Sequence, residues 1–258
     1  MTTYLVVWAS AAFASCLTLP SGFGLGTLLM PVFALFFPVD LAIATASVVH
    51  LFDNLFKFVL FGKHAEKMIL WRFGLPAIIG AFIGGRALFL LSGMPSLFSY
   101  AAFGQTFYVQ PVKVIVALLL ASFALFELIP RLRDISFGDR FLAIGGGLSG
   151  FFGGLSGHQG ALRSAFLVRA GLSKEAFIGT GTAVACLVDL SRLSVYSAYF
   201  SQEGVLENGL LLVGAILSAF LGAFVAGRVV RQVTLKFVRI AVTVMLFAVA
   251  FALGTGLI

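Results

Sequence analysis

The chain has 258 residues, of which 60% are hydrophobic and only 10% are charged, and its mean hydropathy is +1.10. A soluble domain carries about 25% charged residues, so this composition excludes a protein whose surface faces water on all sides. The net charge is +7, but the basic residues stand in short stretches between apolar runs. No basic stripe with stacking aromatic residues is present, which excludes nucleic-acid binding.

Ten apolar segments follow one another along the chain, five in each half. They cover residues 4–19, 22–37, 41–62, 73–92 and 112–130, and then 140–155, 158–171, 175–199, 208–227 and 237–257. A membrane-spanning helix needs about 20 residues, and the first two segments of each half are shorter. We therefore predict an all-α polytopic membrane protein with about eight to ten transmembrane segments. The short segments would form Gly-rich broken or re-entrant hairpins.

Two pairs of similar motifs divide the chain into halves. Residues 80–86 read GAFIGGR and residues 222–228 read GAFVAGR, while Gly-rich tips occur at Ser21–Gly26 and at Ser156–Gly160. We expect a first repeat over residues 1–130 and a second over residues 131–258. Matching Gly-interrupted segments in two apolar halves are typical of secondary transporters. For the glycines of the GAFxxGR motifs, close helix packing is the favoured interpretation.

The charges of the loops predict the orientation of the chain in the membrane. The basic loops 63–72, 131–140 and 228–236 are expected in the cytoplasm, because cytoplasmic loops carry an excess of Lys and Arg. The loops 93–111 and 201–207 contain no Lys and no Arg, and they are expected outside the cell. The two repeats would then be inverted, with both chain ends outside. The longer external loop is expected to form an interfacial cap, with Pro95, Tyr100, Tyr108 and Pro111.

The two Gly-rich tips are the candidate substrate site. Each tip precedes the N-terminus of an expected helix, where unpaired N–H groups and the helix dipole attract anions. In inverted repeats the tips would approach each other near the middle of the membrane. His158 and Gln159 would offer hydrogen-bond donors there, and the guanidinium of Arg163 suits an oxyanion. The expected substrate-binding residues are Gly22, Gly24, Gly26, Gly157, His158, Gln159, Gly160 and Arg163.

Charged residues also occur in the third segment of each half. Asp53 and Lys57 are four residues apart, and Asp189 and Arg192 are three apart, so each pair lies on one face of a helix. Either these are structural ion pairs, or an aspartate carries a coupling proton. Pairing of Arg163 with one of these aspartates is the structural alternative to anion binding. The sequence contains no cofactor motif and no spacing typical of a metal site, and Cys16 and Cys186 are expected to be free thiols.

Two other functions fit parts of the sequence. An anion channel would use the same site but would conduct without coupling. The Gly154–Gly157 stretch matches the GxSG pattern of intramembrane serine proteases, which need a histidine from another helix beside the serine. The same letters recur at Gly147–Gly150, which favours a coincidence of composition.

The Gly-rich turn, the apolar run and the Ala…Thr stretch, repeated after a basic central loop, resemble the sulfite exporter TauE/SafE family. The residues that carry this resemblance are Gly22, Gly24, Gly26, Pro31, Ala42 and Thr45, and then Gly157, Gly160, Ala176 and Thr180. The resemblance implies a multi-pass carrier of the plasma (inner) membrane that exports sulfite, sulfonates or related small anions. It is compatible with a homo-oligomer. The second tip departs from the family pattern, because it lacks the triple glycine and the proline that follows it.

Overall fold

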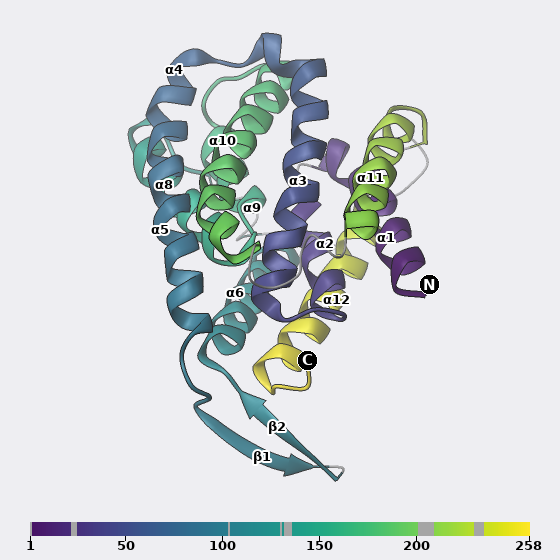
Figure 1. Ribbon diagram of the computed structural model, residues 1–258. Coiled ribbons are helices and arrows are strands. Elements are labelled where there is room, and N and C mark those ends of the chain that lie inside the picture. Colours follow the sequence, from purple (N-terminus) through teal and green to yellow (C-terminus); the bar gives the residue numbers. More distant parts are fainter. Residues whose placement is uncertain are drawn as a thin grey trace.

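The structure is a computed structural model, and it describes residues 2–21, 25–102, 104–129, 131, 136–200, 209–229 and 235–258. Every expected apolar segment contains a helix, and the helices assemble into one bundle (Figure 1). In the first half these are α1 (Thr2–Ser21), α2 (Leu25–Ala34), α3 (Val39–Phe61), α4 (Lys67–Ile69), α5 (Leu75–Ser92) and α6 (Pro111–Leu128). In the second half they are α8 (Leu142–Ser156), α9 (Gly160–Leu167), α10 (Lys174–Phe200), α11 (Gly209–Val229) and α12 (Leu235–Gly254).

Two short helices follow the Gly-rich tips. Helix α2 has 10 residues and α9 has 8, which makes them about 15 Å and 12 Å long. Neither could cross a hydrocarbon core of about 30 Å. Helix α8 ends at Ser156 and is capped by Gly157, whose φ of +80° lies in the left-handed region that glycine adopts without strain. This turn reverses the chain and allows α9 to begin three residues later.

The helix that precedes the loop 93–111 begins earlier than the sequence indicated. Residues 63–72 were expected to form a loop, but α4 begins at Lys67 and continues through a π-helical turn, Leu70–Gly74, into α5. Lys67 and Arg72 are exposed on these first turns. Their long side chains can stay solvated while the backbone is already helical, so the basic residues do not mark where the helix begins.

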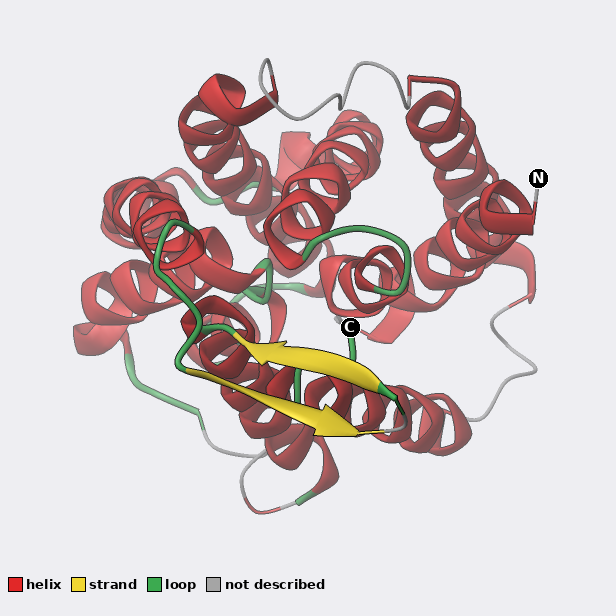
Figure 2. Cartoon of the chain, turned by 60° about the horizontal axis from the view of Figure 1, so that its bottom comes forward, coloured by secondary structure: helices red, strands yellow, loops and turns green. Residues whose placement is uncertain are grey.

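The loop 93–111, which we expect outside, contains a β-hairpin that the sequence analysis did not predict. Strand β1 (Phe98–Ala102) pairs antiparallel with β2 (Gln105–Val109), and the hairpin lies across one end of the bundle (Figure 2). The Tyr100 hydroxyl donates a hydrogen bond to the Thr255 carbonyl oxygen at 2.7 Å, which ties the hairpin to the C-terminal end. Aromatic and β-branched residues, which favour strands, are frequent here: β1 contains Phe98 and Tyr100, and β2 reads QTFYV.

The helices pack in pairs that link the two halves. Helix α5 lies along α8, and α1 lies along α11 on the opposite side of the bundle (Figure 1). Helix α3 packs on α10, and α6 packs on α12. The Trp8 indole N–H donates to the Leu211 carbonyl oxygen at 3.0 Å across the pair α1 and α11.

The glycines of the GAFxxGR motifs allow two of these close approaches. A Cβ atom at Gly80 would collide with the Gly147 carbonyl oxygen of α8, and one at Gly222 would collide with the Ala12 carbonyl oxygen of α1. In both places backbone meets backbone, as the packing interpretation of these motifs expects.

The distribution of polarity is the reverse of that in a soluble protein. Large apolar side chains face outward, among them Val59 (83% exposed), Trp71 (71%) and Phe251 (67%), whereas Asp189 and Arg192 are buried. Within the described residues, three helices are long and apolar enough to cross a membrane: Val39–His64, Lys67–Ser92 and Lys174–Ser197. Such a surface requires an apolar solvent around the bundle. The total number of crossings stays a prediction.

Candidate functional site

The two Gly-rich tips meet inside the bundle. A Cβ atom at Gly26, in the first turn of α2, would lie 2.8 Å from the Gly157 carbonyl oxygen and 3.9 Å from Cδ2 of His50. The start of α2 therefore touches the turn between α8 and α9. Gly22 and Gly24 of the first tip lie outside the described residues, and Gly160 is the first residue of α9.

The second tip buries polar side chains that its own backbone only partly satisfies. His158 is 2% exposed and Gln159 is 1% exposed. The His158 Nδ1 atom lies 2.7 Å from the Ser156 carbonyl oxygen, and the ring stacks on Phe123 of α6. Gln159 uses its backbone carbonyl oxygen, which accepts from the Ser149 hydroxyl at 3.2 Å, whereas its side-chain amide makes no hydrogen bond within the described structure.

Unpaired polar atoms are concentrated at this tip. Seven buried side-chain nitrogen and oxygen atoms of the described residues have no hydrogen-bond partner, and five of them belong to His158, Gln159, Arg163 and Arg192. Buried polar groups in proteins are almost always paired, so a cluster of unpaired ones indicates a place where another molecule binds. Bound water is the simplest such molecule, and a polar substrate is another.

Arg163 lies on the first turns of α9 and points along α10. Its Nε atom is 3.6 Å from where a Cβ atom would stand on Gly181, and its Nη1 atom is buried and unpaired. The structural alternative considered for Arg163 was an ion pair with Asp53 or Asp189. Among the described residues Arg163 forms no such pair, because both aspartates are bound to other cations.

Two buried ion-pair clusters occupy the centre of α3 and α10. Asp53 accepts from the Lys57 ammonium and from the Ser15 hydroxyl of α1, both at 2.6 Å. Asp189 accepts from Arg192 Nη2 at 2.6 Å, and Arg192 Nη1 donates to the Gly153 carbonyl oxygen at 2.9 Å. Both pairs that the residue spacing suggested are therefore formed.

His50 is the site residue that the sequence analysis undervalued. Its Nδ1 atom donates to Asp189 Oδ2 at 2.7 Å, which links α3 to α10. The Asn54 amide lies beside it, 3.4 Å from the same carboxylate oxygen. The signal was present in the sequence, because His50, Asp53, Asn54 and Lys57 share one face of a helix. The partner on the other helix could not be identified without knowing that α3 and α10 touch.

The serine of the GxSG pattern has no catalytic geometry. The Ser156 hydroxyl donates to the Phe152 carbonyl oxygen of its own helix at 3.0 Å. His158 reaches the Ser156 backbone instead of its hydroxyl, and His50 is bound to Asp189. The arrangement gives no support to a protease.

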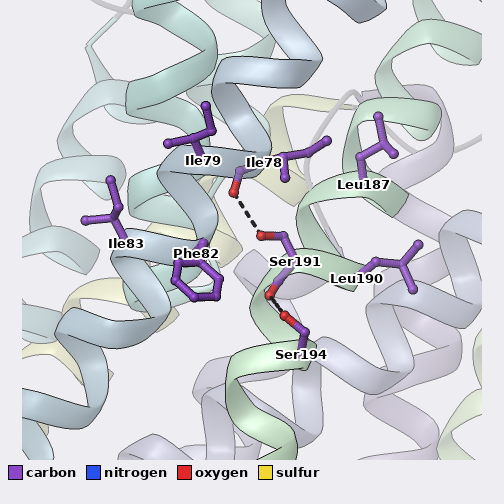
Figure 3. Close-up of a pocket in the computed structure, with 8 residues that line it drawn as sticks. All are labelled: Ile78, Ile79, Phe82, Ile83, Leu187, Leu190, Ser191 and Ser194. Carbon is purple, nitrogen blue, oxygen red and sulfur yellow. Dashed lines mark hydrogen bonds between the residues drawn. The ribbon is translucent and has the colours of Figure 1, made fainter.

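One groove of the described surface lies elsewhere and is apolar. It has a volume of about 550 Å³ and lies between α5 and α10, where it is open on the outside of the bundle (Figure 3). Its only polar atoms are engaged, because Ser191 donates to the Ile78 carbonyl oxygen at 2.8 Å and Ser194 to the Ser191 carbonyl oxygen at 2.6 Å. A lipid-facing groove of this kind has no group that could bind an anion.

The described residues contain no cluster of His, Cys, Asp or Glu that could hold a metal ion.

Comparison with protein families shows to which class of protein this chain belongs. The model of the sulfite exporter TauE/SafE family matches residues 7–253. The chain belongs to the TauE/SafE family.

Membership in the TauE/SafE family agrees with the apolar exterior, and the protein is a multi-pass membrane protein of an exporter-type transporter family. It also agrees with a small anion as the substrate class. No curated protein and no solved structure matches the chain.

Proposed function

We propose that this protein exports a small sulfur-containing anion, such as sulfite or an organosulfonate, across the plasma membrane. Membership in a family described as sulfite exporters supports both the class of substrate and the direction of transport in this proposal. The observation that carries the proposal for this chain is an excess of positive charge on the helices that follow and flank the second tip. Asp53 forms an ion pair with Lys57 and Asp189 with Arg192, which leaves Arg163 without an ion pair among the described residues.

An unpaired cation inside a membrane is costly and is usually functional. Arg163 is accompanied by unpaired donors, namely the Gln159 amide and the Arg192 Nε atom. The N-termini of α2 and α9 add backbone N–H groups on the two sides of the contact between Gly26 and Gly157. An oxyanion bound there would neutralise the charge and accept from these donors.

We further propose that residues 1–130 and 131–258 are inverted repeats and that one moves against the other during transport. The packing pairs support this, because the first apolar segment of each half packs on the fourth apolar segment of the other half. Helix α1 packs on α11, and α8 packs on α5. The third helices, α3 and α10, pack on each other and carry the matching clusters around Asp53 and Asp189.

The test is uptake of radiolabelled sulfite and of taurine-like sulfonates into proteoliposomes that contain the purified protein. The wild type should transport at least one of them with saturation. The Arg163→Ala variant should be slower by about a hundredfold, as expected when one partner of a buried charge pair is removed.

Arg169→Ala is the matched control, because Arg169 is exposed just beyond the end of α9, and it should retain transport. Folded wild-type protein that moves none of these anions would contradict the proposal. A large conductance without saturation would identify a channel in place of a carrier.

A further inference from the structure

The second tip presents hydrogen-bond acceptors as well as donors. The Ser156 carbonyl oxygen can only accept, so the His158 Nδ1 atom, 2.7 Å away, must carry the proton of that hydrogen bond. In the neutral imidazole the other nitrogen, Nε2, then has a lone pair and no hydrogen. This Nε2 atom is buried and has no partner among the described residues.

Gln159 adds a second unpaired acceptor. Both polar atoms of its amide, Oε1 and Nε2, are buried without a hydrogen-bond partner in the described structure. The oxygen and nitrogen of an amide can be exchanged by a flip of the group. For Gln159 a flip does not change the number of unpaired groups, because either orientation leaves one acceptor oxygen and two N–H donors without a partner.

The first half of the chain also reaches this tip. The His158 ring interacts with the Thr27 backbone of α2, and it lies within electrostatic reach of His50 and Arg192. Elements of both tips therefore surround the unpaired atoms of His158 and Gln159, next to cations that would hold an anion.

We propose that this site selects monoanions that carry their own hydrogen-bond donor, such as hydrogensulfite or sulfonates with a hydroxyl or amino group. The inference rests on the proposed function and narrows its substrate class. The negative group would lie toward Arg163 and the donors, and the O–H or N–H of the substrate would point to the Gln159 and His158 acceptors. An anion without a donor leaves these acceptors desolvated and unpaired, which is the strongest basis for rejecting an analogue.

Two sulfonates with the same two-carbon chain form the test. Uptake of 2-hydroxyethanesulfonate and of ethanesulfonate, which lacks only the hydroxyl donor, is measured in proteoliposomes as kcat/KM. The wild type should prefer the hydroxylated anion by about tenfold or more. The Gln159→Met variant has a side chain of similar size without the amide, and it should bring the ratio close to one.

The control is Thr243→Val on α12, which removes another buried hydroxyl that has no partner within the described residues. It should leave the ratio unchanged, because its effect is confined to folding. If Gln159→Met does not fold, His158→Phe serves as the second variant, since it keeps the stacking on Phe123 and removes the acceptor.

The outcomes separate the two proposals. If folded wild-type protein moves neither sulfonate nor sulfite, anion transport itself is wrong. If it transports both sulfonates equally well, or prefers ethanesulfonate, transport stands and the selection for a donor is overturned. A tenfold preference that survives in both Gln159→Met and His158→Phe would also overturn it, because other groups would then recognise the hydroxyl.

Discussion

Single residues in the centre of α3 and α10 carry full charges that lie out of contact with water. Removing one member of a buried ion pair leaves an uncompensated charge and costs about 3–5 kcal/mol, whereas replacing both members is often nearly neutral. Asp53 and Lys57 allow this comparison on one helix, because their charged atoms are 2.6 Å apart. We expect Asp53→Asn alone to lower the free energy of unfolding by about 3 kcal/mol in detergent micelles.

The double variant Asp53→Asn/Lys57→Met should recover most of this loss, and the difference is obtained from a double-mutant cycle. If the losses of the two single variants simply add, the two residues do not stabilise each other. If the double variant is stable but transports nothing, one of these residues also has a role in transport.

At the scale of elements, glycines determine how closely α5 and α8 approach. A Cβ atom on Gly150 would collide with the Ala77 carbonyl oxygen, and one on Gly154 with the Ala81 carbonyl oxygen. These carbonyl oxygens belong to the backbone of α5, so they cannot move aside in the way that a flexible side chain can. We therefore expect Gly150→Ala to lower the free energy of unfolding by at least about 2 kcal/mol, as measured by thermal or denaturant unfolding.

Gly147 provides the control on the same helix, because a Cβ atom there would meet nothing within 4 Å. Gly147→Ala should be neutral, or stabilising by about 0.5–1 kcal/mol through its higher helix propensity. If Gly147→Ala and Gly150→Ala destabilise the protein equally, the loss does not come from the contact between Gly150 and the Ala77 carbonyl oxygen.

The same elements show what the sequence could and could not predict. Hydrophobic runs located every long helix, because a membrane requires apolar length and internal hydrogen bonds whatever the tertiary contacts are. The start of α4 at Lys67 was missed because basic residues were taken as the loop itself. The hairpin of β1 and β2 was missed because its strands lack a turn signal of the Asn-Gly kind, and its position depends on the C-terminal end.

At the candidate site, sequence alone indicated the residues but not their partners. The ion pairs around Asp53 and Asp189 follow from helical spacing, which is local information. The bond between His50 and Asp189 spans 139 residues and depends on which helices touch. The donor role expected for His158 also needed a correction, because its Nδ1 atom is already hydrogen-bonded to the Ser156 carbonyl oxygen, a local contact set by the turn after α8.

For the whole molecule, the inverted arrangement makes a prediction about sidedness. The hairpin between α5 and α6 should be outside the cell, and the loop before α8 should be inside. Single cysteines at Ser99 and at Gly138, in a background with Cys16 and Cys186 replaced by serine, are exposed at these two places. In intact cells we expect a membrane-impermeant maleimide to label Ser99→Cys and not Gly138→Cys.

Permeabilised cells supply the control, since both cysteines should then react. Labelling of both in intact cells would place the two loops on one side, which an odd number of crossings between them does not allow. The inverted arrangement would then be wrong, although the assignment to the family would not change.

The pairing of α1 with α11 has a consequence for how the protein is made. Trp8 and Leu211 are 203 residues apart in the chain. Synthesis at about 5–20 residues per second takes roughly ten to forty seconds to cover that distance. During this time α1 is already in or near the membrane. The surface around Ala12 stays uncovered until Gly222 of α11 has been synthesised and packs on it. A nascent chain that stops before residue 209 would therefore expose this surface to lipid, insertion factors and proteases, and the earliest helix is among the last to reach its final place.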